Sequence, residues 1–237
     1  MFTPQELIEG KIILINKPLR WTSHDVVAKL RSPIKRYCSD KKMKIGHAGT
    51  LDPLATGLLL LLTGKATKRT ESLQGLDKEY TGTITLGANT PSYDAETAVS
   101  ETFSLDGITE EKIYAAAQQF IGEQEQMPPV YSSVQVNGIR AYNYAREGET
   151  VELKTRTITL FKFEITGIRL PEVDFLVHCS KGTYIRSLAF DFGKFLGCGG
   201  YLTALCRTRV GEFLIDDAIE METFLKGITV AKTDESL

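Results

Sequence analysis

Hydrophobic positions along the chain follow two periods, that of half-buried strands and that of amphipathic helices. The apolar run 11–16 predicts a buried strand that ends at Lys17-Pro18, because proline has no N–H to give to a strand ladder. Apolar residues then recur at helical spacing (Val26, Val27, Leu30, Ile34). Thr22 or Ser23 stands where a helix cap is expected, with Asp25 near the exposed N–H groups. A strand followed by a helix is therefore predicted at the start.

The same reading predicts the remaining elements and the fold class. Strands are expected at 58–62, 80–86, 157–166, 175–179 and 202–213, and helices at 66–73, 109–121, 141–146, 184–196 and 216–226. Residues 46–57 are expected to be an irregular glycine-rich loop, Asn137-Gly138 to be a turn, and residues 229–237 to be a loose tail. Strands and helices do not alternate strictly, which predicts an α+β fold rather than a doubly wound sheet.

Composition and charge are those of an ordinary globular protein with one polarised feature. The 237 residues are 42% hydrophobic and 24% charged, with a formal net charge of -2. Residues 29–44 nevertheless carry a net charge of +6, whereas residues 212–237 carry a net charge of -5. This pattern is compatible with a basic surface that docks on phosphates, although a solvated helix and loop would show the same charges.

Cysteine spacing and the apolar runs exclude several classes of protein. The four cysteines, at positions 38, 179, 198 and 206, lack Cys-x-x-Cys spacing, so neither a zinc site nor a disulfide framework is predicted. The longest apolar run, 58–62, is too short to cross a bilayer. We therefore expect a cytoplasmic protein without membrane attachment.

Two glycine-containing segments resemble nucleotide-binding motifs but fail their requirements. In the segment 63–67 the glycine spacing is wrong, and Ala66 stands where a Walker loop needs a hydroxyl. In the segment 197–202, Leu202 replaces the third glycine of a dinucleotide fingerprint. Nucleotide hydrolysis and dinucleotide binding are both disfavoured.

The glycine-rich segment 46–57 carries the most distinctive candidate group, Asp52. Pro53 disfavours the α region for the residue before it and so restricts the backbone of Asp52. Taken alone, an Asp-Pro pair in a loop indicates only a turn.

A resemblance to a known family gives this loop a function. Residues 46–68 (GHAGTLDPLATGLLLLLTGKATK) resemble the catalytic motif of TruB pseudouridine synthases, and residues 78–80 and 179–188 resemble the tyrosine and arginine motifs of that family. The segments 16–18, 127–132 and 197–207 also fit, so that the resemblance spans about residues 10–213. It implies a pseudouridine synthase fold with a central mixed, mainly antiparallel sheet, flanking helices and a thumb-like insertion at about 125–152. The implied catalytic domain covers 1–213, followed by a short C-terminal helix and tail at 214–237.

The resemblance also implies the activity and the site residues. The family isomerises uridine to pseudouridine in the T loop of tRNA, at position 55, after flipping the base out of its stack. Asp52 is then the catalytic carboxylate, Arg186 its partner, and Tyr80 the ring that packs on the target base. His47 would contact the RNA beside the flipped nucleotide. The implied substrate-binding residues are His47, Tyr184, Leu205, Lys17, Lys65, Lys68 and Arg207.

This chemistry predicts neither a cofactor nor a metal, since one carboxylate can break and remake the glycosidic bond. The expected partner is tRNA through its T-arm, no protein partner is required, and a monomer is expected. Many relatives carry a C-terminal PUA domain, which this chain is too short to hold, so binding centred on the T-arm is expected. Cys206 stands where relatives often have arginine, which puts one phosphate contact in doubt.

Two other functions are compatible with the same scaffold. A non-catalytic tRNA-binding or tRNA-folding protein would keep the basic surface without needing Asp52 and Arg186. A guide-RNA-dependent synthase of the same superfamily is disfavoured by the thumb-like segment. The sequence leaves open whether Asp52 attacks C1′ or C6, which tRNA species are used, and the oligomeric state.

Overall fold

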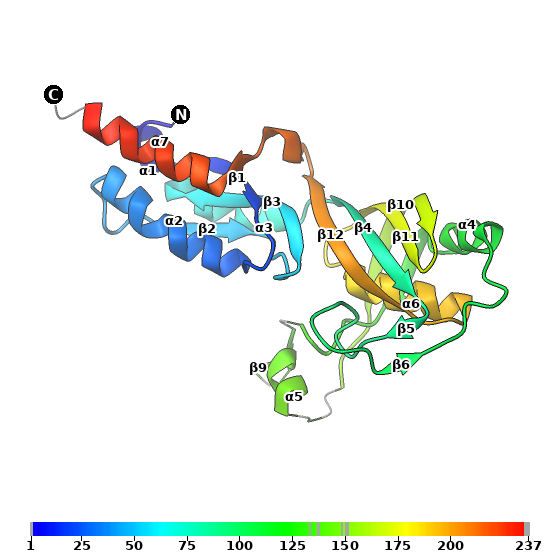
Figure 1. Ribbon diagram of the computed structural model, residues 1–237. Coiled ribbons are helices and arrows are strands. Elements are labelled where there is room, and N and C mark those ends of the chain that lie inside the picture. The colour runs from blue at the N-terminus through cyan, green and yellow to red at the C-terminus, as the bar shows by residue number, and fades with distance from the viewer. Residues whose placement is uncertain (1, 133, 137, 148, 150–151, 235–237) are drawn as a thin grey trace. The chain divides into compact units, whose positions relative to one another are not determined.

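The computed structural model describes residues 2–132, 134–136, 138–147, 149 and 152–234 (Figure 1). Contacts divide the chain into two units, here called unit 1 (1–78 and 206–237) and unit 2 (79–205). Strand β12 (Gly200–Val210) contributes residues to both units. None of the described helices is long and apolar enough to span a membrane.

Unit 1 is a small sheet with helices on its faces. Its helices and 3-10 turns are α1 (Pro4–Glu9), α2 (Ser23–Tyr37), η1 (Gly64–Arg69), α3 (Thr70–Gln74), η2 (Ile215–Asp217) and α7 (Met221–Asp234). Its strands are β1 (Ile12–Lys17), β2 (Ile45–Ala48), β3 (Ala55–Thr63), β13 (Phe213–Leu214) and β14 (Ile219–Glu220). The strand order is β14-β1-β3-β12, with β2 also paired to β3 and β13 to β12. The β1–β14 pair is parallel, whereas the pairs β1–β3, β2–β3 and β12–β13 are antiparallel.

The core of unit 1 lies on both faces of β3. On one face Leu59 and Leu61 pack with apolar residues of β1, α2 and α7, and on the other Leu58, Leu60 and Leu62 pack with residues near η1 and α3. All five leucines are completely buried. Burying a leucine stabilises the fold by roughly 1.5–3 kcal/mol, so β3 is a rigid support for what precedes it in the chain.

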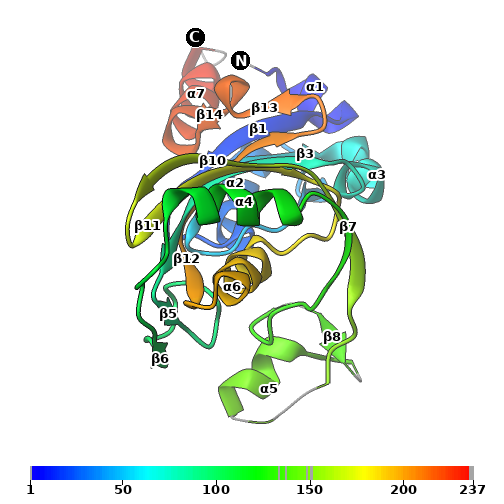
Figure 2. The ribbon, with the colours of Figure 1, turned by 90° about the vertical axis from the view of Figure 1, so that its right-hand side faces the viewer.

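Unit 2 contains a second stretch of sheet, covered by two helices (Figure 2). Its strands are β4 (Lys78–Leu86, whose first residue belongs to unit 1), β5 (Ala88–Asn89), β6 (Glu101–Thr102), β7 (Gly122–Gln126), β8 (Gln135–Val136), β9 (Ile139–Arg140), β10 (Arg156–Arg169) and β11 (Glu172–Cys179). Its helices are α4 (Glu110–Gln119), α5 (Ala141–Glu147) and α6 (Ile185–Leu196). The strand order is β12-β4-β11-β10-β7, and β10 runs antiparallel to both β11 and β7. Edge-to-face aromatic contacts of Phe163 with Phe120, Phe175 and Phe192 join the helices to the sheet.

The predicted α+β class with mainly antiparallel pairing is confirmed, and most predicted elements are present. The first strand and helix lie where expected, and Thr22 caps α2 in a reciprocal capping box with Asp25. Helix α6 ends at Gly197, which has the left-handed conformation expected of a helix stop. The predicted strand face of Tyr80, Ile84 and Leu86 is buried in β4.

Three local predictions were wrong, the first two because strand pairing prevails over local pattern. The two ends of the predicted irregular loop 46–57 are strands, since residues 46–48 belong to β2 and residues 55–57 to β3. The last helix begins at Met221 rather than residue 216, because Ile219 and Glu220 pair with β1. That helix continues to Asp234, where a loose tail was predicted.

Some predictions stay untested. Asn137, at the predicted turn, and residues 235–237, at the end of the predicted tail, lie outside the described residues. The division into a catalytic domain at 1–213 with a thumb at 125–152 also remains a prediction.

Candidate active site

Asp52 lies in a short loop that connects two paired strands of unit 1. Strands β2 and β3 are antiparallel, with Ala48 opposite Leu60, and residues 49–54 connect them. Within the loop the Ala55 N–H donates to the Asp52 carbonyl oxygen at 3.1 Å, which closes a turn around Pro53. Leu51 is buried, and its N–H donates to Ser23 Oγ at 2.8 Å while the Ser23 hydroxyl lies 3.3 Å from the Leu51 carbonyl. The carboxylate of Asp52 is therefore carried by a backbone that is fixed on both sides.

Arg207 anchors this loop from β12. Its guanidinium donates to the carbonyl of Leu58 at 2.8 Å, of Gly49 at 3.1 Å and of Thr50 at 3.5 Å, and the residue is 1% exposed. A methyl group at Gly57, where φ is +101°, would lie 2.4 Å from the Arg207 carbonyl oxygen, so only glycine allows the strands to approach there. One buried cation thus joins the start of the loop to the strand that follows it.

Burial and nearby charges shift the pKa of two further side chains of unit 1, Lys17 and His47. The Lys17 Nζ donates to the carbonyls of Pro18 and Trp21 at 3.0 and 2.6 Å. Burial lowers the pKa of Lys17 to about 8, against the nearby Asp52 carboxylate, which raises it. Burial also lowers the pKa of His47, and the Arg207 charge acts in the same direction, so His47 is neutral at pH 7.

The lowered pKa of Lys17 predicts a specific dependence of stability on pH. Between about pH 8 and the ordinary lysine pKa of 10.5, the folded protein has released the Lys17 proton while the unfolded chain retains it, so the free energy of unfolding rises with pH in that window. We expect the wild type to gain stability relative to Lys17→Met between pH 8 and 10.5, measured by urea unfolding. Lys226→Met, at an exposed lysine of α7, is the control and should leave the difference flat. Parallel curves for wild type and Lys17→Met would contradict the assignment.

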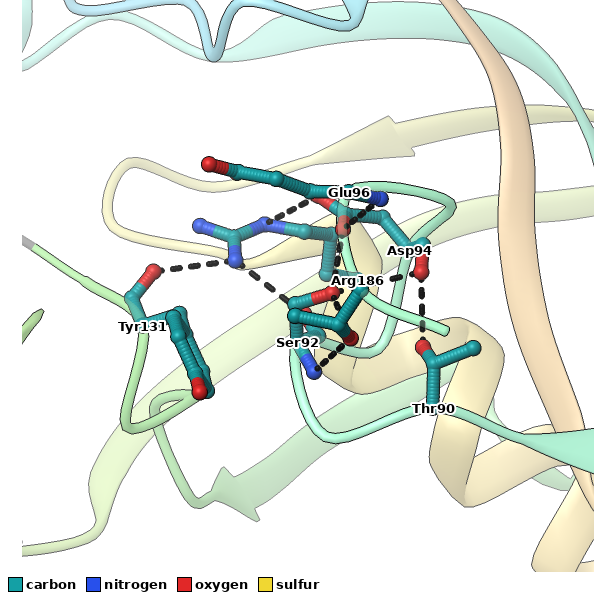
Figure 3. A network of polar contacts seen from close by, with 7 residues as sticks. Thr90, Ser92, Asp94, Glu96, Tyr131 and Arg186 are labelled. Atoms are coloured by element: carbon teal, nitrogen blue, oxygen red, sulfur yellow. Dashed lines mark hydrogen bonds and ion pairs between the residues drawn. The ribbon is translucent and has the colours of Figure 1, made fainter. Parts of the chain in front are cut away.

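Arg186 occupies the first turn of α6 in unit 2 and is 4% exposed. Its Nη1 donates to the carbonyls of Ser92 and Tyr131 at 3.1 and 2.9 Å, and its Nε lies 3.6 Å from Asp94 Oδ2 (Figure 3). The guanidinium is therefore held in one orientation by backbone acceptors and one buried carboxylate.

Asp94, which the sequence analysis did not single out, organises the loop beneath Arg186. Its Oδ1 accepts from the Ser92 hydroxyl at 2.6 Å and from the Glu96 N–H at 2.9 Å, and its carbonyl accepts from Thr90 Oγ1 at 2.7 Å (Figure 3). The intervening Tyr93 has a φ of +62° and stacks on Phe190, with ring centroids 4.1 Å apart. No regular pattern marks such a loop, so the only available signal was an acid among hydroxyl residues.

The other predicted residues of unit 2 line the strands and the start of α6. Tyr80 is buried on β4, and Leu205 is half-buried on β12. Tyr184 precedes α6, where its N–H and carbonyl pair with the side-chain amide of Gln126 at 2.8 and 3.0 Å. The Arg156 guanidinium lies 5.2 Å from the Tyr184 ring centre, within cation–π distance.

The lysines and the arginine of unit 1 that were predicted to bind substrate divide into two groups. Lys65 and Lys68 are exposed on η1, as a contact with RNA requires. Lys17 and Arg207 are buried and donate to backbone carbonyls, which favours a structural role over the predicted direct contact. Asp52 belongs to unit 1 and Arg186 to unit 2, so their pairing stays a prediction.

Comparison with known proteins identifies the family. Residues 35–185 match the family description "TruB family pseudouridylate synthase (N terminal domain)", and residues 186–237 match "tRNA pseudouridylate synthase B C-terminal domain". Proteins named tRNA pseudouridine synthase B are similar along nearly their whole length. The relative from Flavobacterium johnsoniae is 52% identical over 94% of this chain and 97% of its own, and that from Chloroherpeton thalassium is 49% identical over 96% and 93%.

Solved structures agree with this result. A chain of "Crystal Structure of a Cbf5-Nop10-Gar1 Complex" matches with a TM-score of 0.73 and 29% identity over 99% of this chain. A chain of "Structure of H/ACA RNP bound to a substrate RNA containing 2'-deoxyuridine" matches with a TM-score of 0.70 and 28% identity. This chain spans about three fifths of those two, 61% and 60%. Family match, curated relatives and fold together show that the chain belongs to the TruB family of pseudouridylate synthases.

Proposed function

We propose that the protein isomerises uridine to pseudouridine in tRNA, at position 55 of the T loop. The observation that carries the proposal is the Asp52 loop, which lies within the matched family region and is anchored by Ser23 and Arg207. A fixed carboxylate suits a reaction whose rate depends on holding one nucleophile against one sugar or base.

The reaction breaks the N1–C1′ bond of uridine, turns the base and joins C5 to C1′. The proton at C5 is lost to solvent, and N1 takes up a proton in its place. Asp52 is the nucleophile in this proposal, and it must be ionised to act. A guanidinium favours the charged form of a neighbouring carboxylate and orients it by paired hydrogen bonds, which is the role we give to Arg186. Asp94 and the carbonyls of Ser92 and Tyr131 would hold Arg186 ready for it.

Substrate binding requires a flipped nucleotide and an anionic backbone. Tyr80 would stack on the extruded base, and His47 would lie beside the flipped nucleotide, with Tyr184 and Leu205 completing the contact. Phosphates of the T-arm would meet the exposed basic residues of the segments 29–44 and 65–69, which are Lys29, Arg31, Arg36, Lys41, Lys42, Lys44, Lys65, Lys68 and Arg69. The segment 125–152 would act as a thumb on the T-arm, and we place the activity in the cytoplasm.

Both alternative functions predict no product on bare tRNA, unlike the proposed function. A non-catalytic RNA-binding protein forms no product, and a guide-dependent synthase forms none without its guide. We expect the purified protein to release tritium from a tRNA transcript labelled at C5 of uridine, without any other RNA or protein.

The T-arm alone should be an adequate substrate. Because residues 29–44 carry a net charge of +6 and supply most of the proposed phosphate contacts, we expect an isolated T-arm hairpin to bind with an affinity similar to that of full tRNA, within about tenfold. Titration of both RNAs at one salt concentration measures this. A preference of several hundredfold for full tRNA would contradict binding centred on the T-arm.

A further inference from the structure

Arg20 adopts a backbone conformation that an arginine rarely takes. Three non-glycine residues in the described part of the chain have a positive φ: Arg20 at +66°, Ser39 at +51° and Tyr93 at +62°. Such residues are strained, because their Cβ crowds the backbone, and they persist where surrounding structure or function imposes them.

The other two outliers have a structural reason. Ser39 follows Cys38, the C-cap residue of α2, and its N–H donates to the Arg36 carbonyl. This is the position after a helix where a left-handed residue is common. Tyr93 lies in the loop of Asp94 and is held by stacking on Phe190. Neither argument explains why an arginine stands at position 20.

The backbone of Arg20 is bonded to the loop of the proposed nucleophile. Its N–H donates to the Pro53 carbonyl at 2.7 Å, one residue after Asp52. The same turn is held on either side by Lys17, which donates to Pro18 and Trp21, and by Ser23, which bonds to Leu51. These bonds fix where the Arg20 Cα lies relative to the Asp52 loop.

The bond to Pro53 accounts for the backbone conformation but not for the side chain. A glycine would adopt the same φ without strain and make the same N–H bond. The arginine is exposed, and so is its neighbour Leu19, at 52%. Among the residues that the structure describes, no acid forms an ion pair with Arg20. The long cation therefore stands at a strained position beside the Asp52 loop, without an ion-pair partner in the described part of the chain.

We propose that Arg20 binds a backbone phosphate of the RNA next to the uridine that is isomerised. A planar guanidinium can donate two parallel hydrogen bonds to a phosphate, which fixes register as well as adding affinity. A contact so close to Asp52 would bear on the target nucleotide itself, whereas the lysines of η1 and residues 29–44 would hold the rest of the T-arm. The inference rests on the proposed function, since it assumes an RNA substrate at Asp52.

Arg20→Gly separates the phosphate contact from the fold. We would measure binding of a T-arm hairpin across a series of KCl concentrations, with Asp52→Asn as the parent so that the RNA is not turned over. Loss of one phosphate contact lowers the slope of log K against log salt by roughly 0.7–0.9 and the affinity by roughly tenfold. The melting temperature should not fall, because glycine removes the strain. Arg20→Lys, which keeps the charge, should keep most of the slope.

One control excludes a general effect of surface charge. Lys226→Ala removes an exposed cation from the acidic C-terminal segment and should leave the slope unchanged. An unchanged slope in Arg20→Gly, or an equal loss in Lys226→Ala, overturns the inference while the proposed function stands. If the parent itself does not bind the hairpin, both fall.

Discussion

Asp52→Asn should abolish pseudouridine formation, lowering the rate by at least about 10³-fold, while the affinity for tRNA changes little. Asparagine has nearly the same shape and keeps the turn, because the bonds that fix the loop are made by backbone atoms of Leu51, Asp52 and Ala55. Only the anionic nucleophile is lost. Tritium release measures the rate, and titration with labelled tRNA measures the affinity.

Glu71→Gln is the matched control for this experiment. Glu71 is an exposed acid on α3 in the same unit. The substitution Glu71→Gln therefore removes one negative charge, as Asp52→Asn does, but outside the Asp52 loop. Its rate should stay within about twofold of the wild type, as surface substitutions usually do. A similar rate in Asp52→Asn and Glu71→Gln would remove Asp52 from the chemistry.

Arg186→Met should be the most destabilising of the substitutions considered, and it should also be inactive. It leaves Asp94, whose side chain is 5% exposed, without the cation 3.6 Å away. Breaking a buried pair on one side costs about 3–5 kcal/mol, because the remaining charge stays buried. That is a large part of the roughly 5–15 kcal/mol that stabilises a typical domain. Chemical unfolding measures the loss.

The double variant Asp94→Asn with Arg186→Met tests the cause of that loss. Removing the stranded carboxylate should restore part of the stability but none of the activity, since the proposed partner of Asp52 is still absent. Arg209→Met is the comparison for a partly exposed pair, because Arg209 lies 3.3 Å from Asp77 and the two side chains are 25% and 34% exposed. We expect this substitution to lower the free energy of unfolding by less than about 1 kcal/mol. Equal costs at Arg186 and Arg209 would show that the Asp94 network does not hold the guanidinium.

The sequence predicted those elements whose stability comes from their own pattern. Helix α2 could be predicted because its apolar stripe and its cap, Thr22 with Asp25, are both local. Strand β3 could be predicted because a run of five leucines can only be buried. Strand β7 could not, since its residues after Gly122 are all polar and it is defined by pairing with β10 at the sheet edge.

The site shows the same division between motif and surroundings. Asp52, Arg186 and Tyr80 could be singled out because each lies in a motif that resembles one of the family, and their roles stay predictions. Asp94 lies in a loop without periodicity, and its interaction with Arg186 appears only when the chain brings the two together from distant positions in the sequence. The substrate contact expected of Arg207 also stays a prediction, whereas its hydrogen bonds to the carbonyls of Gly49, Thr50 and Leu58 are a property of the folded chain alone.

Nucleotide-resolution chemical mapping of pseudouridine in a bare tRNA transcript treated with the purified protein tests the central claim most directly. The account predicts one new pseudouridine, at position 55 of the T loop, with wild-type protein and none with Asp52→Asn. A transcript without pseudouridine, or one modified equally by both proteins, would contradict it.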